Sequence, residues 1–398
     1  MKVQGRIPEL DGLRGIAIGM VLVYHYFLLT SHVRLGSLLS RSLALGRMSW
    51  SGVDLFFVLS GFLIGGILLD GRDSTNYYSV FYKRRFFRIV PIYMVCLAGF
   101  FALRAFIQTG HASNFAYMMK DQLPAWPYFT FLQNFWMART NSLGAFGLGA
   151  TWSLAVEEQF YLTLPLLIRL LPRRRLAAFL VVTVLAALVL RIFLVLVWRD
   201  HSLSRFVLMP CRADALLLGV LGATAVRDPK SYEWLSGNRK LLGILAGVLA
   251  LGVGVMTYLR AGQEGVVIQT GGLTWLAAFY LCILLLAVTG PSDWIKRLLR
   301  MKWLMWLGGI AYGTYLFHEF VLGALFTLFR SRPIALYNIT DVLTAVAALA
   351  LTLFFCKISW TYFEKPLIKI AHRSGYVFAD AARPKTASAL NATSEGTS

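Results

Sequence analysis

The stretch of chain that decides the fold is LRGIAIGMVLVYHYFLLT, residues 13–30. It is apolar along most of its length, but it carries Arg14 at its start and His25 in its second half. In a regular helix the step from Arg14 to His25 turns through ~1100°, which is three turns plus about 20°, so both side chains lie on one face roughly 16 Å apart along the axis. Ionisable groups within an apolar span are costly and usually line a cavity or a pathway. The stretch therefore predicts a membrane helix with a functional face.

Composition extends this interpretation to the whole chain. Of the 398 residues, 58% are hydrophobic and 15% are charged, whereas soluble proteins carry about 25% charged residues. Repeated apolar windows of about 20 residues predict an all-α, polytopic membrane protein with about ten transmembrane helices. The predicted spans are 13–32, 50–69, 89–109, 150–170, 176–198, 206–226, 241–259, 272–289, 303–327 and 341–362.

Basic residues predict the orientation in the membrane. With the N-terminus in the cytoplasm, most of the 39 Lys and Arg residues fall on the cytoplasmic side of the predicted spans, as the positive-inside rule requires. Both termini are then cytoplasmic. The same clusters account for the formal net charge of +20 without a nucleic acid partner, because they face an anionic inner leaflet.

The chain divides into one membrane domain and a short tail. Residues 1–370 hold all the predicted spans, while residues 371–398 are rich in Ala, Ser and Thr and are predicted to be a disordered cytoplasmic tail. The four cysteines lie in or beside apolar windows without metal-ligand spacing, so we expect small core residues and no metal site. Asp54, Arg212 and Asp214 are expected to be charge-paired structure, because unpaired charges inside a membrane protein are very costly.

Seven short blocks, spread from residue 8 to residue 366, carry the most specific pattern in the chain. They are PELDGLRG (8–15) leading to Tyr24-His25, SGVDLFFVLSGFL (51–63), FYKRRFFRIVPIY (81–93), TWSLAVEEQFY (151–161), the set Pro210, Arg212, Asp214 and Gly219, the set Tyr312, Tyr315, Leu316 and His318, and EKP (364–366). In this order they resemble the membrane-bound acyltransferase-3 family of integral membrane O-acyltransferases. One departure is Ala311, where the family often has Ser. Longer members also carry an SGNH-hydrolase domain after the membrane part, which is not expected here.

The resemblance implies an activity and its substrates. The donor is expected to be cytoplasmic acyl-coenzyme A, most simply acetyl-CoA, which acts as a substrate rather than as a permanently bound cofactor. The acceptor is expected to be a hydroxyl group of a saccharide or glycolipid at or beyond the outer face of a bacterial inner (cytoplasmic) membrane. Expected partners are therefore acyl-CoA, the saccharide acceptor and the lipid bilayer.

Two histidines are candidate catalytic bases. Acyl transfer to a hydroxyl needs a base near the attacking oxygen, and an imidazole titrates near neutrality. His25 is the first candidate, because it shares a face with Arg14. His318, on a stripe with Thr314 and Tyr315, is either a second base or a structural partner. The alternative for His25 is a structural histidine bonded to a neighbouring helix.

Three arginines are candidate donor-binding residues. Arg14 opens the first span beside Gly12 and Gly15, and free N–H groups at a helix N-terminus suit an anion. Arg85 and Arg88 are one helical turn apart, so their planar guanidinium groups would both hydrogen-bond a diphosphate. The alternatives are a positive-inside anchor for Arg14 and a lipid-facing basic cluster for Arg85 and Arg88.

Two glutamates complete the candidate catalytic set. Glu157 and Glu158 are adjacent, so their side chains point about 100° apart in a helix. Ser153, Glu157 and Tyr161 form an i, i+4, i+8 polar stripe. Glu157 is therefore predicted to face the catalytic cavity, and Glu158 to pair with an arginine such as Arg212.

A rival function is a proton-coupled transporter or flippase of a glycan or small molecule. Intramembrane His, Glu, Asp and Arg residues also mark proton relays. Against this, the sequence has no detectable repeat of the kind that many transporters show. Release of free coenzyme A upon addition of an acceptor would distinguish the transferase from the transporter.

Overall fold

The computed structural model describes residues 7–29, 46–110, 113–259 and 261–378. Helices make up most of these residues, and the β-pairing among them is a single antiparallel bridge between Ser74 and Phe378. The predicted all-α fold is therefore confirmed for the described part of the chain. Residues 379–398 of the predicted tail lie outside it.

Within the described residues, seven helical segments are long and apolar enough to cross a membrane. They are Arg47–Gly71, Tyr77–Gln108, Arg173–Val197, Ser202–Arg227, Arg239–Tyr258, Ile268–Val288 and Ile339–His372. The predicted spans 13–32, 150–170 and 303–327 are also helical over their described residues, but their helices carry ionisable side chains. The structure supports a multi-pass membrane protein, while the number of ten and the cytoplasmic termini stay predictions.

The helices in the predicted spans have the following bounds: α1 (Pro8–Val23) with the π-helical turn η1 (Tyr24–Leu28), α3 (Gly52–Gly71) after the 3-10 turn η2 (Arg47–Ser51), α4 (Tyr77–Gln108), α7 (Thr151–Leu170), α8 (Arg173–Val197), α10 (Met209–Arg227), α12 (Arg239–Tyr258), α13 (Leu273–Val288) after the π-helical turn η4 (Ile268–Gly272), α15 (Lys302–Gly309) with α16 (Ala311–Arg330), and α17 (Ile339–Ser359). The ninth predicted span is thus two helices, divided at Ile310. The shorter elements are η3 (Ser113–Met119), α5 (Trp126–Phe129), α6 (Gln133–Thr140), α9 (Ser202–Val207), α11 (Pro229–Gly237), α14 (Trp294–Leu299), η5 (Trp360–Glu364) and α18 (Lys365–His372).

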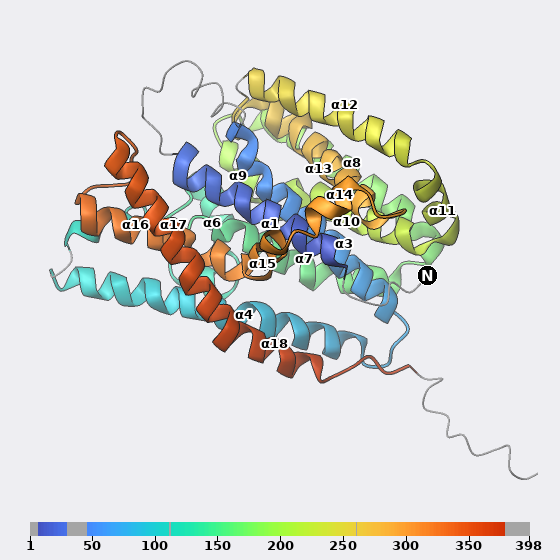
Figure 1. Cartoon of the computed structure of the whole chain (residues 1–398), viewed down its shortest axis with the longest axis horizontal. Helices are drawn as coiled ribbons and strands as arrows, with labels where there is room; N and C mark the ends of the chain where they lie inside the picture. Colours follow the sequence, from blue (N-terminus) through green and yellow to red (C-terminus); the bar gives the residue numbers. More distant parts are fainter. Residues whose placement is uncertain (1–6, 30–45, 111–112, 260, 379–398) are drawn as a thin grey trace, which may run out of the picture.

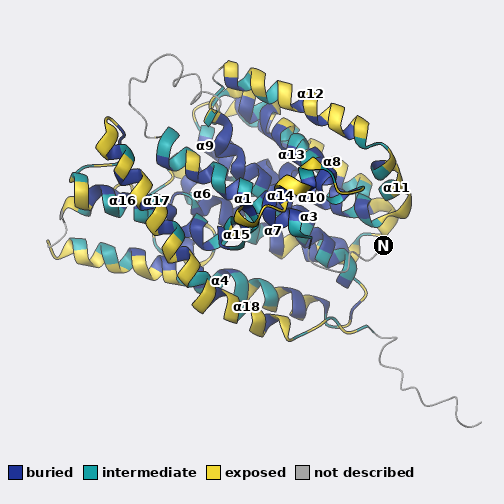
Figure 2. Cartoon of the chain, viewed as in Figure 1, coloured by how far each residue is buried: buried dark blue, intermediate teal, exposed yellow. Residues whose placement is uncertain are grey.

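The buried centre of the molecule is built on α3, which packs against α1 and α10 (Figures 1 and 2). A Cβ atom added at Gly61 would lie 1.8 Å from the carbonyl oxygen of Leu216, and one at Gly219 would lie 2.2 Å from that of Val58. The backbones of α3 and α10 therefore approach too closely for any side chain at these two glycines. Small residues at helix contacts are the usual basis of tight packing in membrane proteins.

A second close contact fixes α1. A Cβ atom added at Gly12 would lie 2.0 Å from the carbonyl oxygen of Leu299 in α14, and one at Gly15 would lie 2.1 Å from that of Leu304 in α15. On the other side of the contact, a Cβ at Gly308 would lie 1.9 Å from the Asp11 carbonyl oxygen. These contacts set the rotation of α1 and hence the direction of its polar side chains.

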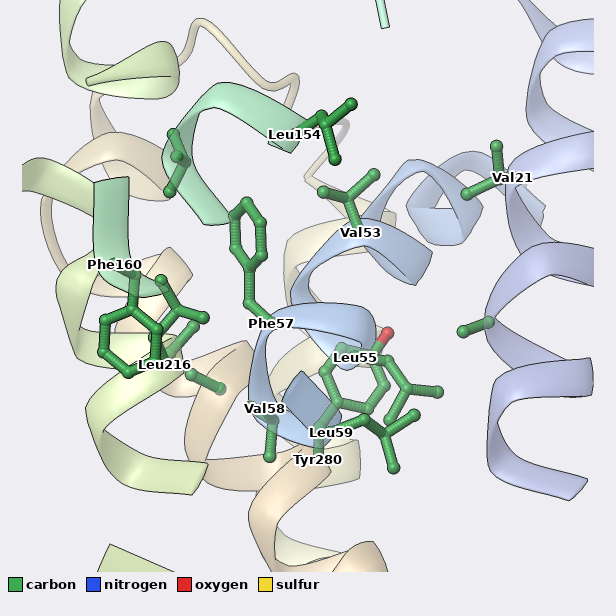
Figure 3. Packing of buried hydrophobic residues seen from close by; sticks show 14 of the residues in the cluster. Val21, Val53, Leu55, Phe57, Val58, Leu59, Leu154, Phe160, Leu216 and Tyr280 are labelled. Atoms are coloured by element: carbon green, nitrogen blue, oxygen red, sulfur yellow. The ribbon is translucent and has the colours of Figure 1, made fainter. Parts of the chain in front are cut away.

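Apolar side chains from five helices meet around α3. Figure 3 shows Val21 of α1, Phe57 of α3, Phe160 of α7, Leu216 of α10 and Tyr280 of α13 within this core. All five are buried. Because α3 is covered on several sides, its residues can line an internal cavity rather than face lipid.

Two buried ion pairs join the core helices, as expected for Asp54, Arg212 and Asp214. Arg212 Nη2 lies 2.6 Å from Asp54 Oδ1, and Arg191 Nη2 lies 2.7 Å from Asp214 Oδ2. Both pairs are almost completely buried. Breaking such a pair by removing one partner is strongly destabilising, because it leaves an uncompensated buried charge. All four cysteines are also buried and unpaired, as predicted.

Many residues of the peripheral helices α12 and α17 are exposed (Figure 2), and α8, α12 and α17 all carry exposed apolar side chains. Leu196, Leu251 and Phe354 are among their exposed residues. Exposed apolar helix faces of this extent match contact with lipid rather than water.

The start of the predicted tail lies against the start of α4. The Asn76 amide donates to the Gly375 carbonyl and accepts from the Val377 N–H, both at 2.9 Å. Residues 371–378 are therefore attached to the membrane domain, next to the point where α18 packs on α4.

Candidate active site

A cavity of about 270 Å³ lies among α1, α3, α4, α7, α16 and the C-terminal elements η5 and α18. Four residues predicted from the sequence line it: Arg14, Arg85, Arg88 and Glu157. Tertiary packing thus brings together side chains from α1, α4 and α7. The predicted residues that do not line this cavity are Glu158, His25 and His318.

The basic run in α4 is divided between two environments. Arg85 and Arg88 line the cavity, and their i, i+3 spacing places them on one face of the helix. Arg84 instead donates to the Ser374 carbonyl at 2.8 Å and lies 5.4 Å from the centre of the Tyr376 ring. The lipid-facing alternative therefore does not describe Arg85 and Arg88.

Arg14 reaches the same cavity from α1. Its guanidinium lies 3.0 Å from Asp11 Oδ1, one turn earlier on the helix, and Arg88 and Arg85 lie close enough for their charges to act on it. The prediction that free backbone N–H groups at the start of the helix bind an anion beside Arg14 is wrong. The helix α1 begins earlier, at Pro8, and Gly12 and Gly15 pack against α14 and α15. Arg14 therefore offers its side chain rather than backbone N–H groups.

Glu157 faces the cavity together with the predicted polar stripe. Ser153, Glu157 and Tyr161 all line it. The hydroxyls of Ser60 and Tyr161 lie 2.6 Å apart, and both residues line the cavity together with Glu157. Ser153 Oγ lies 2.6 Å from the Tyr315 hydroxyl. This face of α7 therefore presents a carboxylate and two hydroxyl groups to the cavity.

Glu158 does not line the cavity, as expected from the angle of about 100° between its side chain and that of Glu157. Its Oε1 is buried and has no hydrogen-bond partner among the described residues. The predicted pairing with Arg212 is wrong, because Arg212 is bound to Asp54 in the core. The positive charge that acts on Glu158 is that of Arg85, which also interacts with Glu157.

His25 belongs to a second polar region, at the other end of α1. Its Nδ1 lies 2.9 Å from the Val21 carbonyl oxygen, and its Nε2 lies 3.4 Å from Glu319 Oε1. The His25 and His318 rings are 4.8 Å apart between centroids. A bond to a neighbouring helix was the alternative foreseen for His25, but the partner, Glu319, was not predicted. An acidic residue directly after His318 within an apolar span was the signal that could have found it.

His25 lies in a π-helical turn that follows α1, whereas Arg14 lies within α1 itself. The regular-helix geometry used for the prediction applies only as far as Val23, where α1 passes into η1. A π-turn adds residues to the turn and so rotates the side chains that follow it, and such turns are frequent at functional sites. From this turn, His25 contacts His318 and Glu319 of α16.

Tyr315 and His318 connect the two regions along α16. Tyr315 lines the cavity, and its ring centroid is 5.9 Å from that of His318, one turn further along. His318 is fully buried, its Nδ1 lies 2.8 Å from the Tyr315 carbonyl oxygen, and its Nε2 has no hydrogen-bond partner among the described residues. The cavity thus ends about one helical turn from the histidines.

Sequence reasoning also missed several cavity residues near the C-terminus. Trp360, Glu364 and His372 line the cavity, and Glu364 accepts a hydrogen bond from Ser359 at 3.0 Å. Glu364 was noted only as part of the closing EKP block. Its position is a result of the π-helical turn η5 and of the packing of α18 on α4.

Comparison with known proteins identifies the family of this chain. Residues 7–361 match the family described as "Acyltransferase domain". The O-acetyltransferase OatA of Staphylococcus aureus strain NCTC 8325 / PS 47 is 28% identical over 384 residues, covering 91% of this chain and 57% of that protein. OatA of strain MRSA252 matches with the same identity and coverage, and a further S. aureus protein, from strain COL, is 27% identical over 375 residues. The chain therefore spans little more than half the length of these relatives. No solved structure matches it significantly.

Proposed function

This chain belongs to the acyltransferase family, and from this premise we propose that it moves an acyl group, most simply acetyl, from acyl-coenzyme A to a hydroxyl of a saccharide or glycolipid. The donor is cytoplasmic and the acceptor lies at or beyond the outer face of a bacterial inner membrane. The relatives named as O-acetyltransferases support the class of reaction. The rival transporter function is not favoured by the family match.

The observation that carries this proposal is the cavity lined by Arg14, Arg85 and Arg88. Three guanidinium groups around one internal volume suit a ligand with several negative charges, and paired arginine forks bind phosphates particularly well. Coenzyme A carries such phosphates at one end and the reactive thioester at the other. We place its charged end among these arginines and its acyl end towards Tyr315.

The transfer itself forms one bond and breaks one. The acceptor oxygen attacks the thioester carbonyl carbon, a C–O ester bond forms, the C–S bond breaks, and coenzyme A leaves as the thiolate. The hydroxyl proton passes to a base and then to the leaving thiolate. The arginine side chains are available to donate to the carbonyl oxygen as it becomes negative.

His25 is the base in this proposal. A carbonyl oxygen can only accept, so the 2.9 Å contact with Val21 places the ring proton on Nδ1 and leaves the Nε2 lone pair free in the neutral ring. Glu319, 3.4 Å from Nε2, stabilises the imidazolium formed when that lone pair accepts a proton. The two groups are 294 positions apart in the chain and meet only because η1 faces α16.

The test uses the full chain purified in detergent with acetyl-CoA labelled in its acetyl group. Wild-type protein is incubated with and without membrane glycolipid or cell-wall glycan extract, and free coenzyme A and labelled glycan are measured by mass spectrometry. A transferase releases coenzyme A and labels the glycan in equal amounts, and only when acceptor is present. Movement of unmodified substrate across reconstituted vesicles without release of coenzyme A would instead support the transporter and reject the proposal.

A further inference from the structure

The three polar side chains at the far end of α1 converge on a small volume. Ligand atoms of His25, His318 and Glu319 all lie within 4.8 Å of one another. Two come from α16 and one from η1, so the group is held by two packed helices rather than by a loop. It lies outside the arginine-lined cavity.

The tautomers of both histidines are fixed by the backbone. His25 Nδ1 contacts the Val21 carbonyl at 2.9 Å, and His318 Nδ1 contacts the Tyr315 carbonyl at 2.8 Å. Both Nδ1 atoms therefore carry protons, and in the neutral rings both Nε2 atoms carry lone pairs. An N–H that donates to a backbone carbonyl while the other nitrogen stays free is the usual arrangement of a metal-binding histidine.

The free atoms of the cluster are all acceptors. Two imidazole lone pairs and a carboxylate oxygen face one another. Among the described residues, the Glu319 carboxylate accepts a hydrogen bond from the Gly147 N–H, which lies 3.2 Å from Oε2. In the same part of the chain, His318 Nε2 is buried and has no hydrogen-bond partner. Buried acceptors without a donor are costly. One proton can bridge His25 and Glu319 but leaves His318 unsatisfied, whereas a metal cation satisfies all three.

The donor set and the spacing select a class of ion. Zinc binds imidazole nitrogens and carboxylate oxygens at about 2.0–2.1 Å, so neighbouring ligand atoms around a tetrahedral ion are about 3.4 Å apart. The separation between His25 Nε2 and Glu319 Oε1 is 3.4 Å. Two nitrogens with one oxygen favour Zn²⁺ and similar ions over Ca²⁺ or Mg²⁺, which take oxygen ligands. The His25 side chain is 20% exposed, which provides access.

We propose that His25, His318 and Glu319 form a binding site for Zn²⁺ or a similar borderline divalent ion, and that its occupation blocks acyl transfer. The ion uses the Nε2 lone pair of His25, which the transfer needs as proton acceptor. The blocking role rests on the proposed function, whereas metal binding does not. The sequence predicted no metal site, because ligands so distant in the chain leave no recognisable spacing.

Metal binding is tested on the full chain, purified in detergent and treated with chelator. Co²⁺ is then added, because its visible absorption reports tetrahedral coordination. We expect one Co²⁺ per chain, displaced by Zn²⁺. His318→Ala and Glu319→Gln are expected to weaken Zn²⁺ binding by at least about 10-fold. His372→Ala is the matched control, because His372 makes the same Nδ1 contact to a helix carbonyl, at 2.8 Å from Ile368, without the other two ligands.

Thermal unfolding shows whether each variant is folded. Zn²⁺ is expected to raise the melting temperature of wild-type protein and of His372→Ala, because a ligand of the folded state stabilises it, and to have little effect on Glu319→Gln. Absence of a Co²⁺ signal in folded wild-type protein, or an unchanged signal in folded His318→Ala, would overturn the site.

The blocking role is tested separately by adding Zn²⁺ to wild-type protein in the transfer reaction. Transfer is expected to fall as the site fills and to return when chelator is added. Metal binding with unchanged or increased transfer would overturn the blocking role alone. If wild-type protein bound Co²⁺ but showed no transfer either with or without metal, the proposed function would fail while the metal site stood.

Discussion

The two polar regions along α1 differ in how their charges are satisfied. Around the cavity, the guanidinium groups of Arg14, Arg85 and Arg88 surround an open volume, which the carboxylate of Glu157 also lines. At the other end, His25 and Glu319 contact each other directly. The first region has positive charge available for a ligand, whereas the second brings a carboxylate next to imidazole nitrogens.

This difference separates binding from chemistry. A region with several cations around a cavity can hold a large anion, but arginines stay protonated and are poor proton acceptors. A histidine with a fixed tautomer beside a carboxylate can accept and release a proton. Variants in the two regions should therefore fail in different ways, and the predictions below test that separation from the largest expected effect to the smallest.

His25→Ala should abolish transfer and leave acyl-CoA binding intact. Loss of a general base typically costs about 10²–10⁴-fold in rate, and His25 does not line the cavity. Glycan acetylation measured by mass spectrometry and acetyl-CoA affinity measured by calorimetry report the two effects. His201→Ala, in a histidine outside both regions, is the control. Wild-type acetylation by His25→Ala at equal expression would remove His25 from the mechanism.

Arg85→Gln and Arg88→Gln should weaken acetyl-CoA binding, whereas Arg84→Gln should not. Hydrogen bonds to charged groups contribute about 1.5–3 kcal/mol, which corresponds to roughly 10- to 150-fold in Kd. Arg84 is the matched control because it belongs to the same basic run but contacts Ser374 and Tyr376. Calorimetry on the three variants decides. Equal acetyl-CoA affinity of all three variants would mean that these arginines interact with the membrane surface rather than with the donor.

Glu157→Gln should lower turnover by roughly 10-fold or more with near-normal protein yield, because its carboxylate faces the cavity. Glu158→Gln should instead lower thermal stability, because it removes the negative charge beside Arg85 and leaves that buried cation less compensated. Turnover and melting temperature are measured for both. If Glu158→Gln lost turnover at full stability while Glu157→Gln worked normally, the roles assigned to the two glutamates would be reversed.

Gly15→Ala should destabilise the protein by about 1–3 kcal/mol, because its new Cβ would lie 2.1 Å from the Leu304 carbonyl oxygen. The shift of α1 should weaken acetyl-CoA binding modestly through Arg14. Gly19→Ala is the control on the same helix, since its Cβ would lie 3.9 Å from Leu307 Cδ2. Thermal unfolding and calorimetry measure both effects. Equal stability of the two variants would mean that this contact does not position α1.

Local patterns were sufficient to predict much of this protein. The apolar windows predicted the helices, and the i, i+3 spacing of Arg85 and Arg88 predicted their common face. The i, i+4, i+8 stripe on α7 predicted that Glu157 lines the cavity and that Glu158 does not. These predictions need only the repeat of the α-helix, which the backbone imposes on any sequence that forms one.

Predictions that needed an irregular backbone or a distant partner were the ones that failed. The break at Ile310 and the π-helical turn at Tyr24–Leu28 change the direction of side chains without a clear local signal. Arg212, the suggested partner of Glu158, pairs with Asp54 instead, because several acidic residues in other helices were equally compatible with the sequence.

The sequence by itself therefore determined a helical membrane protein with a charged face on its first helix and a basic pair on α4. Only the tertiary structure decided three features: Arg84 contacts Ser374 instead of lining the cavity, Glu319 contacts His25, and the two polar regions are separate. The physical reason is that side-chain direction along one helix follows from its own periodicity, whereas contacts between distant segments depend on how closely the helices pack. In this protein that packing is set by glycines that let backbones touch.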